Sequence, residues 1–530
     1  KIFLETGFST NYERYNTIYQ KGLQKERTDP AWYTTINRTD TARGTAWGAG
    51  AGINGMYPDS LALMGAVSYV TGTHNVKVGI QDHWGTYRNT RLANGDLRAQ
   101  FNNGVPYQVS ILNTPVDYTD KLKMDLGVFA QDQWTIKRLT LNYGARYEVF
   151  RHGVAEETSG AGRYVAARTF SAIDMPTWKS IAPRVGIIYD VFGNQKTAIK
   201  ASLGKFMQAG TVGFSQSQNP ALLTSQTVAW TDLNGDGNPQ GELGCVYLTD
   251  GCELNLAGQL PKTFGTVAPV AYAPDIKRMY NIETSASIQQ EVFRGISVTA
   301  GWYRREYFNL RRRFNTGVSA SDFTPFTLYS PINGSPITYY NVSAAKASQL
   351  AVNLQDQNSP DRTMKYNGFE YNFTARLGKV NLFGGGMIER MLTNTCDDGW
   401  NPNLLLYCDQ TKSDIPFRSQ FKIAGSVPLK YGINFGVAFQ SLPGYVYGTT
   451  SQYALTGVSG PSGITTNNPP AGAGTVWQIT KATAYTASSP CVAQGTCAVG
   501  QLVNPGITVS SLNVPLVAPM TEYGDRINQL

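Results

Sequence analysis

The six cysteines of the sequence form three pairs of close neighbours along the chain. Each pair lies in a segment rich in Gly, Asn and Pro, which is typical of disulfides that fasten long loops in an oxidising compartment. Free thiols and a zinc site are the alternatives, and zinc is the weaker one because no Cys-x2-Cys motif occurs and the three histidines are dispersed. We predict three disulfides, which join Cys245 to Cys252, Cys396 to Cys408, and Cys491 to Cys497.

A second group of polar residues has the spacing of a calcium-binding loop. Asp232, Asn234 and Asp236 occupy positions 1, 3 and 5, and Gly237 occupies position 6, as at the start of an EF-hand loop. Position 12 is not acidic, and Glu242 comes one place early. Turn chemistry alone also favours Asp, Asn and Gly in such a segment. We expect any bound calcium to be held by Asp232, Asn234 and Asp236, with Glu242 as a weaker ligand.

No pattern in the sequence meets the requirements of a catalytic site. The letters of 50–55 match GxGxxG, but the preceding apolar strand and the following helix that dinucleotide binding needs are both missing. GxxxxGK[ST], HExxH and GxSxG motifs do not occur. The adjacent carboxylates Glu156–Glu157 and Asp397–Asp398 fall in expected loops, where we expect them to be solvated rather than opposed across a substrate. We therefore predict that the protein is not an enzyme.

The composition excludes several classes of protein. The 530 residues carry 45 Lys and Arg against 37 Asp and Glu, a formal net charge of +8, yet charged residues make up only 15%. Hydrophobic residues at 42% and aromatic residues at 12% exclude disorder. A membrane-spanning helix needs about 20 apolar residues, whereas the longest nearly apolar stretch is 61–70. Nucleic acid is not an expected partner, because the basic residues are scattered along the chain.

Alternation of apolar and polar residues with a period of two is the main structural pattern. In 139–149, apolar Leu141 and Tyr147 alternate with polar Arg146 and Glu148, as in a strand with two unlike faces. The same alternation runs through 122–136, 181–191, 197–206, 280–292, 296–303, 367–377, 380–388, 417–427 and 433–441. Most of these runs exceed the roughly 5–6 residues of a globular strand and match the roughly 9–11 residues of a membrane-crossing strand.

The connections between these expected strands are of two kinds. Short turns lie at 137–138, 192–196, 293–295, 378–379 and 428–432, and the long insertions include 207–278, 304–365 and 445–520. Short turns that alternate with long loops are typical of an outer-membrane barrel, with tight periplasmic turns and long extracellular loops. Aromatic residues near strand ends fit interfacial girdles, although they also suit the core of a soluble β-protein. These aromatic residues are Trp134, Tyr147, Tyr189, Tyr280, Trp302 and Tyr303.

We therefore predict an all-β fold, a large antiparallel transmembrane β-barrel with long extracellular loops. Hydrocarbon offers no hydrogen-bond partners, so every backbone group must pair within a closed sheet. The apolar face is expected to meet lipid, and the polar face is expected to line the lumen. The polar side chains expected in the lumen include Arg146, Glu148, Glu283 and Gln289.

Several of these strand and turn segments resemble TonB-dependent outer-membrane receptors. The run 126–147 (LGVFAQDQWTIKRLTLNYGARY) is similar to a barrel strand pair of that family, and 181–202 is similar to the next hairpin. Segments 367–370, 417–422 and 440–444, together with the ending 523–530 (YGDRINQL), resemble the Oar-like branch. In that branch a plug and a carboxypeptidase-regulatory-like domain precede the barrel. The resemblance covers most of 60–450 and the last segment, 523–530.

The resemblance implies a barrel of about 22 strands, of which about 15 or 16 can be counted here. The sequence has no start methionine and no signal peptide, and we interpret it as an excerpt or mature fragment. We interpret 1–530 as part of the barrel, with the plug, the TonB box and the regulatory-like domain expected before residue 1. The closing strands with a terminal aromatic residue are expected after Leu530.

The function that follows is ligand capture by the extracellular loops and import through a plug-gated lumen in the bacterial outer membrane. The expected partners are outer-membrane lipid and lipopolysaccharide, a TonB-type energy complex that acts through the N-terminal parts, and an unknown imported ligand. No cofactor is expected apart from calcium in an extracellular loop. One alternative is a passive porin or a surface-structural, adhesive barrel. A second alternative is a secreted soluble β-rich enzyme or lectin.

Overall fold

The computed structural model of the chain describes 1–210, 212–267, 270–329, 336–350, 352–444, 446–447, 464–465, 476–480, 508, 511–515, 518 and 520–530. Within these residues, no helix is both long and apolar enough to cross a membrane. The α-helices are short, and they are α1 (Ala31–Thr34), α2 (Gly213–Gln216), α3 (Leu256–Gln259) and α4 (Ala344–Ala347).

One antiparallel sheet of 16 strands forms the wall of the molecule. Its strands are β1 (Ile2–Tyr12), β2 (Tyr15–Thr17), β5 (Ile53–Thr71), β6 (His74–Leu92), β9 (Val116–Ile136), β10 (Leu139–Val154), β13 (Ile173–Asp174), β14 (Trp178–Asp190), β15 (Thr197–Met207), β18 (Tyr280–Phe293), β19 (Ile296–Phe308), β24 (Thr363–Leu377), β25 (Val380–Asn394), β26 (Arg418–Pro428), β27 (Asn434–Leu442) and β33 (Ile527–Gln529). The long strands pair in chain order from β1 to β33, while β2 pairs with β5 and β13 pairs with β10.

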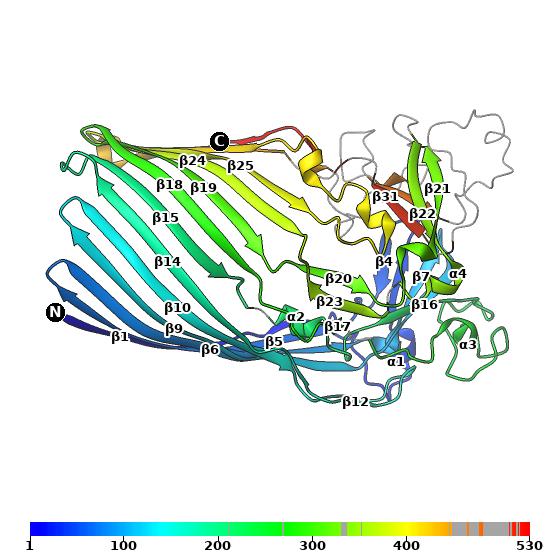
Figure 1. The fold of residues 1–530 in the computed structure, drawn as a ribbon. Helices are drawn as coiled ribbons and strands as arrows, with labels where there is room; N and C mark the ends of the chain where they lie inside the picture. The colour runs from blue at the N-terminus through cyan, green and yellow to red at the C-terminus, as the bar shows by residue number, and fades with distance from the viewer. Residues whose placement is uncertain are drawn as a thin grey trace.

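The connections of the wall are sorted by length. Each short turn between two neighbouring strands of the wall lies at the end drawn on the left in Figure 1, and the long connections gather at the other end. In a barrel of this kind the short turns are periplasmic and the long loops are extracellular. The short turns are 72–73, 137–138, 191–196, 294–295, 378–379 and 429–433.

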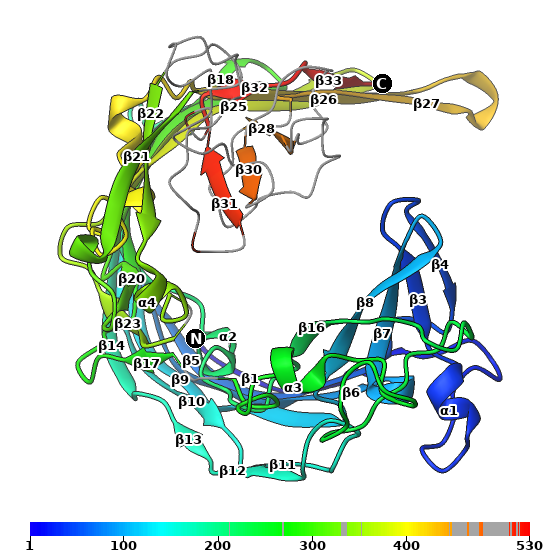
Figure 2. The ribbon, with the colours of Figure 1, turned by 90° about the vertical axis from the view of Figure 1, so that its right-hand side faces the viewer.

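The wall curves around an open interior, as Figure 2 shows. Its first and last strands are β1 and β33, and the described residues do not pair these two strands with each other. The described sheet is therefore a large part of a barrel wall rather than one of two stacked layers.

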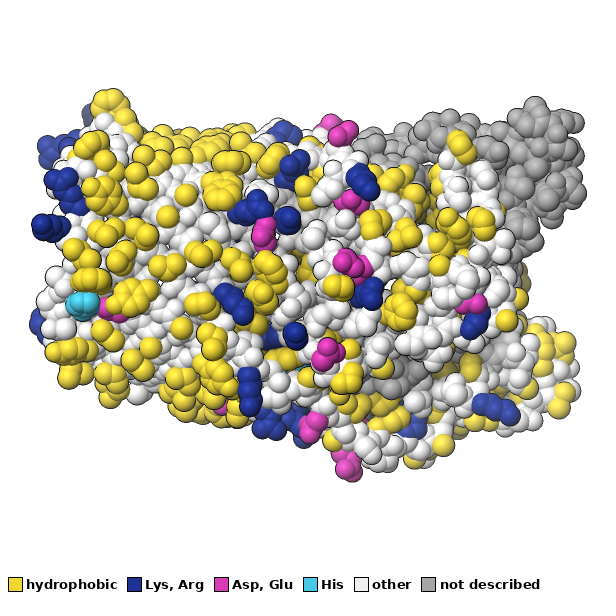
Figure 3. Space-filling view, in the orientation of Figure 1, with side chains coloured by type: hydrophobic (Ala, Val, Ile, Leu, Met, Phe, Trp, Pro, Cys, Tyr) yellow, Lys and Arg dark blue, Asp and Glu magenta, His cyan; other side chains and the backbone are white. Residues whose placement is uncertain are grey.

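The two faces of the wall differ as the alternation predicts. Cross-strand partners point to the same side, so Val185, Leu203 and Thr284 share the outer face, while Gly186, Ser202 and Ser285 share the inner face. Val185 is 43% exposed and Leu203 is 49% exposed. Figure 3 shows hydrophobic side chains spread over the outer surface of the wall. These rows are uncovered, which confirms the predicted membrane barrel and contradicts a sandwich that buries them.

A buried hydrophobic core lies outside the wall, among the long connections. A five-stranded sheet of β3 (Asn37–Asp40), β4 (Thr45–Gly48), β7 (Leu97–Asn102), β8 (Val105–Leu112) and β16 (Ser225–Ala229) stands at the extracellular end. The core that includes residues of this sheet and its neighbours contains Ile36, Leu97, Val109, Ile111 and Leu254, which are almost completely buried. The smaller strands are β11 (Glu157–Ser159), β12 (Arg168–Phe170), β17 (Ala271–Tyr272), β20 (Arg311–Asn315), β21 (Phe323–Tyr329), β22 (Pro336–Val342), β23 (Leu354–Asn358), β28 (Val446–Tyr447), β29 (Ile464–Thr465), β30 (Val476–Thr480), β31 (Ser511–Pro515) and β32 (Glu522–Tyr523).

Each of the alternating runs found in the sequence is a strand of the wall, and several strands continue past the predicted ends. β19 and β24 extend into the predicted insertion 304–365, because residues at the two ends of that insertion continue the pairing of the two strands, as Glu306 does with Lys365. The hairpin of β5 and β6 has no counterpart in the sequence prediction. In β5 the inner face carries Ala62, Met64 and Ala66, so both faces of that strand are apolar and its alternation disappears, whereas β6 keeps polar Lys77 and Gln81 on the inner face. The insertion 445–520 lies mostly outside the described residues.

We expect Val185→Arg to destabilise the barrel by about 2–4 kcal/mol, because it places a charge in the middle of the lipid-facing surface. Ser285→Arg is the matched control. Ser285 follows Thr284, which is aligned with Val185 and Leu203 across the sheet, but its side chain faces the interior, on the same side as Glu283. Urea unfolding of both variants in lipid vesicles measures the difference. Equal destabilisation by the two changes would contradict the assignment of faces.

Candidate functional site: the polar lumen and its loop mouth

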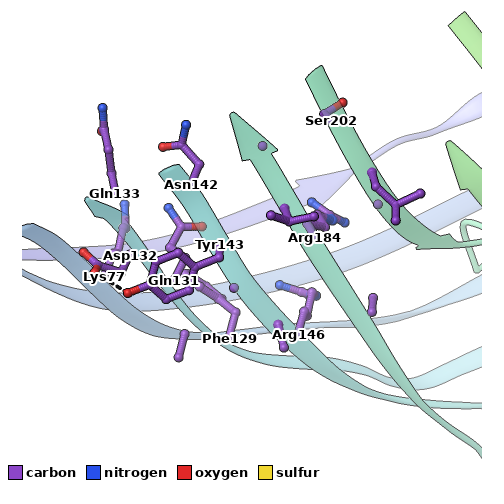
Figure 4. Close-up of a pocket in the computed structure, with 18 of the residues that line it drawn as sticks. Lys77, Phe129, Gln131, Asp132, Gln133, Asn142, Tyr143, Arg146, Arg184 and Ser202 are labelled. Atoms are coloured by element: carbon purple, nitrogen blue, oxygen red, sulfur yellow. Dashed lines mark hydrogen bonds between the residues drawn. The ribbon is translucent and has the colours of Figure 1, made fainter. Parts of the chain in front are cut away.

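A polar hollow of ≈ 680 Å³ runs along the inner face of the wall. Figure 4 shows Gln131, Asn142, Arg146, Arg184 and Ser202 around it. They come from β9, β10, β14 and β15, and the alternation of each strand turns them inward. The lumen surface therefore offers hydrogen-bond donors, acceptors and charge to whatever fills it.

Several lumen charges have polar or charged partners. Lys77 Nζ lies 2.6 Å from Glu5, and Arg305 Nε lies 2.9 Å from Glu283. Lys200 Nζ donates to Gln289 Oε1 at 2.8 Å. The inward orientation predicted for Glu283 and Gln289 is thus confirmed, and the same holds for Arg146 and Glu148 on β10. Paired charges leave the lumen hydrophilic without a strong field of one sign.

Glu148 connects the wall to the longest described connection. It is 8% exposed and lies 2.9 Å from Arg278 Nη1 and 3.3 Å from Arg146 Nε. Arg278 also donates to the carbonyl oxygen of Gln208, at 3.0 Å from Nε and 2.7 Å from Nη2. A buried carboxylate is tolerated only when it is paired and hydrogen-bonded. The pairing therefore holds both ends of the connection 208–279 against β10.

An aromatic cluster stands beside this ion pair at the mouth of the lumen. Ring centroids of Phe150 and His152 are 4.9 Å apart, and those of Trp178 and Phe214 are 5.6 Å apart. The guanidinium of Arg311 lies 4.4 Å above the Phe214 ring. Offset and tilted rings at these distances attract one another, and cations are attracted to ring faces. The cluster fixes the base of the extracellular loops.

The acidic pair Asp397–Asp398 was predicted to be solvated, and that prediction is wrong. The Asp397 side chain is 2% exposed and lies 2.9 Å from Arg362 Nε and 3.7 Å from Arg312 Nη1. Arg362 also contacts Asp398. The arginines come from segments 35–86 residues away along the chain, so a local window of sequence could not show them. The pair is a structural ion network, not an acid/base pair.

Glu157 of the other acidic pair is also buried, whereas Glu156 is exposed. Its Oε1 accepts hydrogen bonds from the Thr119 backbone N–H at 2.6 Å and from Asn219 Nδ2 at 2.9 Å. Burial raises the pKa of Glu157 to about 7, although these hydrogen bonds oppose the shift. Glu157 therefore joins β11 and the segment near Asn219 to the extracellular end of β9.

Two of the predicted disulfides are present. Cys245 and Cys252 are joined with a Cα–Cα distance of 5.8 Å, and Cys396 and Cys408 with a Cα–Cα distance of 4.9 Å. Both lie in long extracellular connections. Cys491 and Cys497 lie outside the described residues, so their pairing stays a prediction.

The expected calcium ligands are close together, but their oxygen atoms also serve the loop backbone. Asp232 accepts hydrogen bonds from Gly235 N at 2.8 Å and Gly237 N at 2.9 Å, and Asp236 accepts one from Asn238 N at 2.7 Å. Asn234 accepts one from Asp236 N at 3.0 Å. Glu242 lies apart, at 2.7 Å from Arg163 Nε. In the described part of the chain, no group of three His, Cys, Asp or Glu side chains could hold a metal ion. Calcium binding stays a prediction.

Comparison with known families agrees with this architecture. The family described as outer membrane beta barrel domain matches residues 3–385. The chain belongs to this family. It is accordingly a β-barrel protein of the bacterial outer membrane.

Solved structures similar to the chain include the outer membrane transporter YddB from Escherichia coli, at 12% identity and a TM-score of 0.42, covering 85% of this chain and 51% of that one. The FrpB iron transporter from Neisseria meningitidis has 9% identity and a TM-score of 0.34, with 74% and 52% covered. The ferric-catecholate import receptor Fiu from E. coli K12 has 10% identity and a TM-score of 0.38, with 75% and 45% covered. The chain spans about half the length of these proteins. A search of curated proteins found no match.

We expect the loop base around Glu157 to be more stable at pH 5 than at pH 8. The carboxyl group ionises near its ordinary value in the unfolded chain but near 7 when folded, so stability falls as pH rises through that interval. Hydrogen exchange of residues 157–170, corrected for the intrinsic rate, should show protection at pH 8 that is lower by up to about 70-fold. Glu157→Gln keeps the acceptor oxygen and should reduce the difference, whereas the buried Asp120 nearby remains ionisable. A difference of unchanged size in this variant would contradict the assignment.

A calcium site in the 232–242 loop, which the spacing of Asp232, Asn234 and Asp236 suggests, would have a dissociation constant of roughly 10⁻⁴–10⁻³ M, as in extracellular modules. Isothermal titration of the protein with CaCl₂ measures it, and the double variant D232N/D236N should lose the heat of binding. The variant D250N/D275N removes two exposed carboxylates elsewhere in the loops and should bind as the parent does. No calcium heat in the parent protein would refute the prediction.

Proposed function

We propose that the chain forms the barrel of a TonB-dependent receptor, which captures a ligand at its extracellular loops and imports it through a plug-gated lumen. The observation that carries the proposal is the placement of the folded loops over a polar lumen at one end of the wall. The resemblance of 126–147 and 523–530 to that receptor family supports it.

The loops have the properties of a capture surface. Their base is rigid, because a buried core, two disulfides and the Arg362–Asp397 ion pair hold it. Large aromatic side chains remain exposed on the five-stranded sheet, among them Trp47 of β4 and Tyr107 of β8. Binding residues on rigidly based loops are common in proteins that recognise ligands.

The lumen suits gated passage rather than bond chemistry. Its paired charges and amides provide a hydrated lining that a plug domain can pack against and leave. In the proposed mechanism an upstream plug occludes this lumen until a TonB-type complex at the inner membrane pulls it aside. Lipopolysaccharide would surround the extracellular part of the wall.

A passive porin is the alternative within the same family of barrels, because an open polar lumen also conducts ions. A surface-structural barrel is a further form of this alternative. The secreted soluble enzyme or lectin is excluded by membership of the outer-membrane family.

We expect the whole protein, expressed from its complete reading frame, to show no steady conductance in planar bilayers in KCl. Urea, which unfolds a plug before a barrel, should open a large conductance reversibly. A porin would conduct continuously without urea, and that result would overturn gating. In parallel, the purified periplasmic domain of TonB should bind the whole protein, and its failure to bind would overturn the energy coupling.

A further inference from the structure

Five of the six described short turns of the wall carry cations, and none of the six carries a carboxylate. These turn cations, which we call the basic rim, are Lys137, Arg138, Lys196, Arg294, Lys379 and Lys430. No Asp or Glu occurs within the described turns. Figure 3 shows dark blue side chains at the left-hand end of the molecule, where these turns lie.

The cations of the basic rim are exposed and form no ion pairs in the described structure. Elsewhere in the described chain, lumen and loop cations such as Lys77, Arg305 and Arg362 are paired with carboxylates. The nearest acid to the turn 191–196, Asp190, instead accepts hydrogen bonds from the backbone of Gly193 and Gln195 at 2.9 Å. The rim is therefore a band of positive charge that the chain itself leaves uncompensated.

Adjacent turns are close enough to share one layer of counter-ions. Two strands separate successive turns, so they lie about 10 Å apart along the rim. This spacing is comparable with the screening length of physiological salt, about 8 Å, and mutual repulsion of the cations is only partly screened. An anionic layer at the rim would relieve that repulsion.

Large apolar side chains flank these cations and point into open space. Phe293 precedes Arg294 and is 69% exposed, and Tyr431 follows Lys430 and is 96% exposed. Leu377 precedes the turn 378–379, and Phe192 lies within the turn 191–196; both side chains are exposed. An apolar side chain beside a cation fits the boundary where acyl chains meet phosphate groups. An acidic protein partner would pair with the cations but would leave these apolar side chains exposed to water.

We propose that the basic rim binds the phosphodiester headgroups of anionic phospholipids in the periplasmic leaflet of the outer membrane. The cations pair with the phosphates, while Phe293, Tyr431 and their counterparts insert among the upper acyl carbons. This contact fixes the depth and tilt of the barrel at its periplasmic edge. The inference rests on the membrane barrel and its orientation, and it is independent of the proposed import.

Binding of phosphatidylglycerol to the delipidated whole protein tests the proposal. Phosphatidylcholine, which has no net charge, is the reference lipid, and native mass spectrometry counts the bound lipids. The parent protein should prefer phosphatidylglycerol. The variant R294Q/K379Q should lose about fivefold or more of that preference, and R294K/K379R should retain it. Heat-modifiable gel migration confirms that each variant is folded.

The matched control is K21Q/K262Q, which removes two exposed cations from the long connections at the opposite end. It should leave the preference unchanged. Equal loss in the control, or no preference in the parent, would overturn the proposal. Displacement of phosphatidylglycerol by an equal concentration of inorganic phosphate would also overturn it, because the rim would then be a site for free anions rather than for lipid.

Discussion

The structure depends on one constraint, which is that hydrocarbon offers the backbone no hydrogen-bond partner. Only strands that pair on both sides satisfy their N–H and C=O groups there. Pairing in chain order from β1 to β33 meets this requirement along the wall. The same pairing places alternate side chains in lipid and in the lumen, so a single arrangement of the backbone gives the protein both its membrane anchorage and its polar interior.

Outside the hydrocarbon layer the chain is surrounded by water, and there it buries its apolar side chains instead of exposing them. The wall leaves side chains such as Val185 uncovered, whereas the extracellular connections bury Leu97 and Leu254 in a core of the kind found in water-soluble domains. Ion pairs such as Glu148–Arg278 then join the two regions. The loops are therefore folded structures with a fixed base.

The strands of the wall could be predicted because the pattern that marks them lies within short stretches of sequence. Period-two alternation and turn length identified β9, β10, β14, β15 and the later hairpins. The rule failed at β5, where Ala62 and Met64 make the inner face apolar too.

The loop structure was much less predictable, because its determinants are distant in sequence. Cysteine spacing alone was sufficient for Cys245–Cys252 and Cys396–Cys408. The burial of Asp397 depends on Arg362 and Arg312, and the burial of Glu157 depends on Thr119 and Asn219. No local pattern marks such partners, so the sequence suggested solvated acids where the structure has buried ones.

The most direct measurement of the central claim is the solvent environment of each position along β14 and β15. Single nitroxide labels from 181 to 189 and from 198 to 206, in the folded protein in lipid vesicles, report collisions with oxygen from the lipid and with a water-soluble nickel complex. The account predicts that the ratio of the two alternates with every residue, with oxygen dominant at Val185 and Leu203 and nickel dominant at Gly186 and Ser202. A ratio without alternation, or labels at Val185 and Leu203 shielded from both reagents, would contradict it.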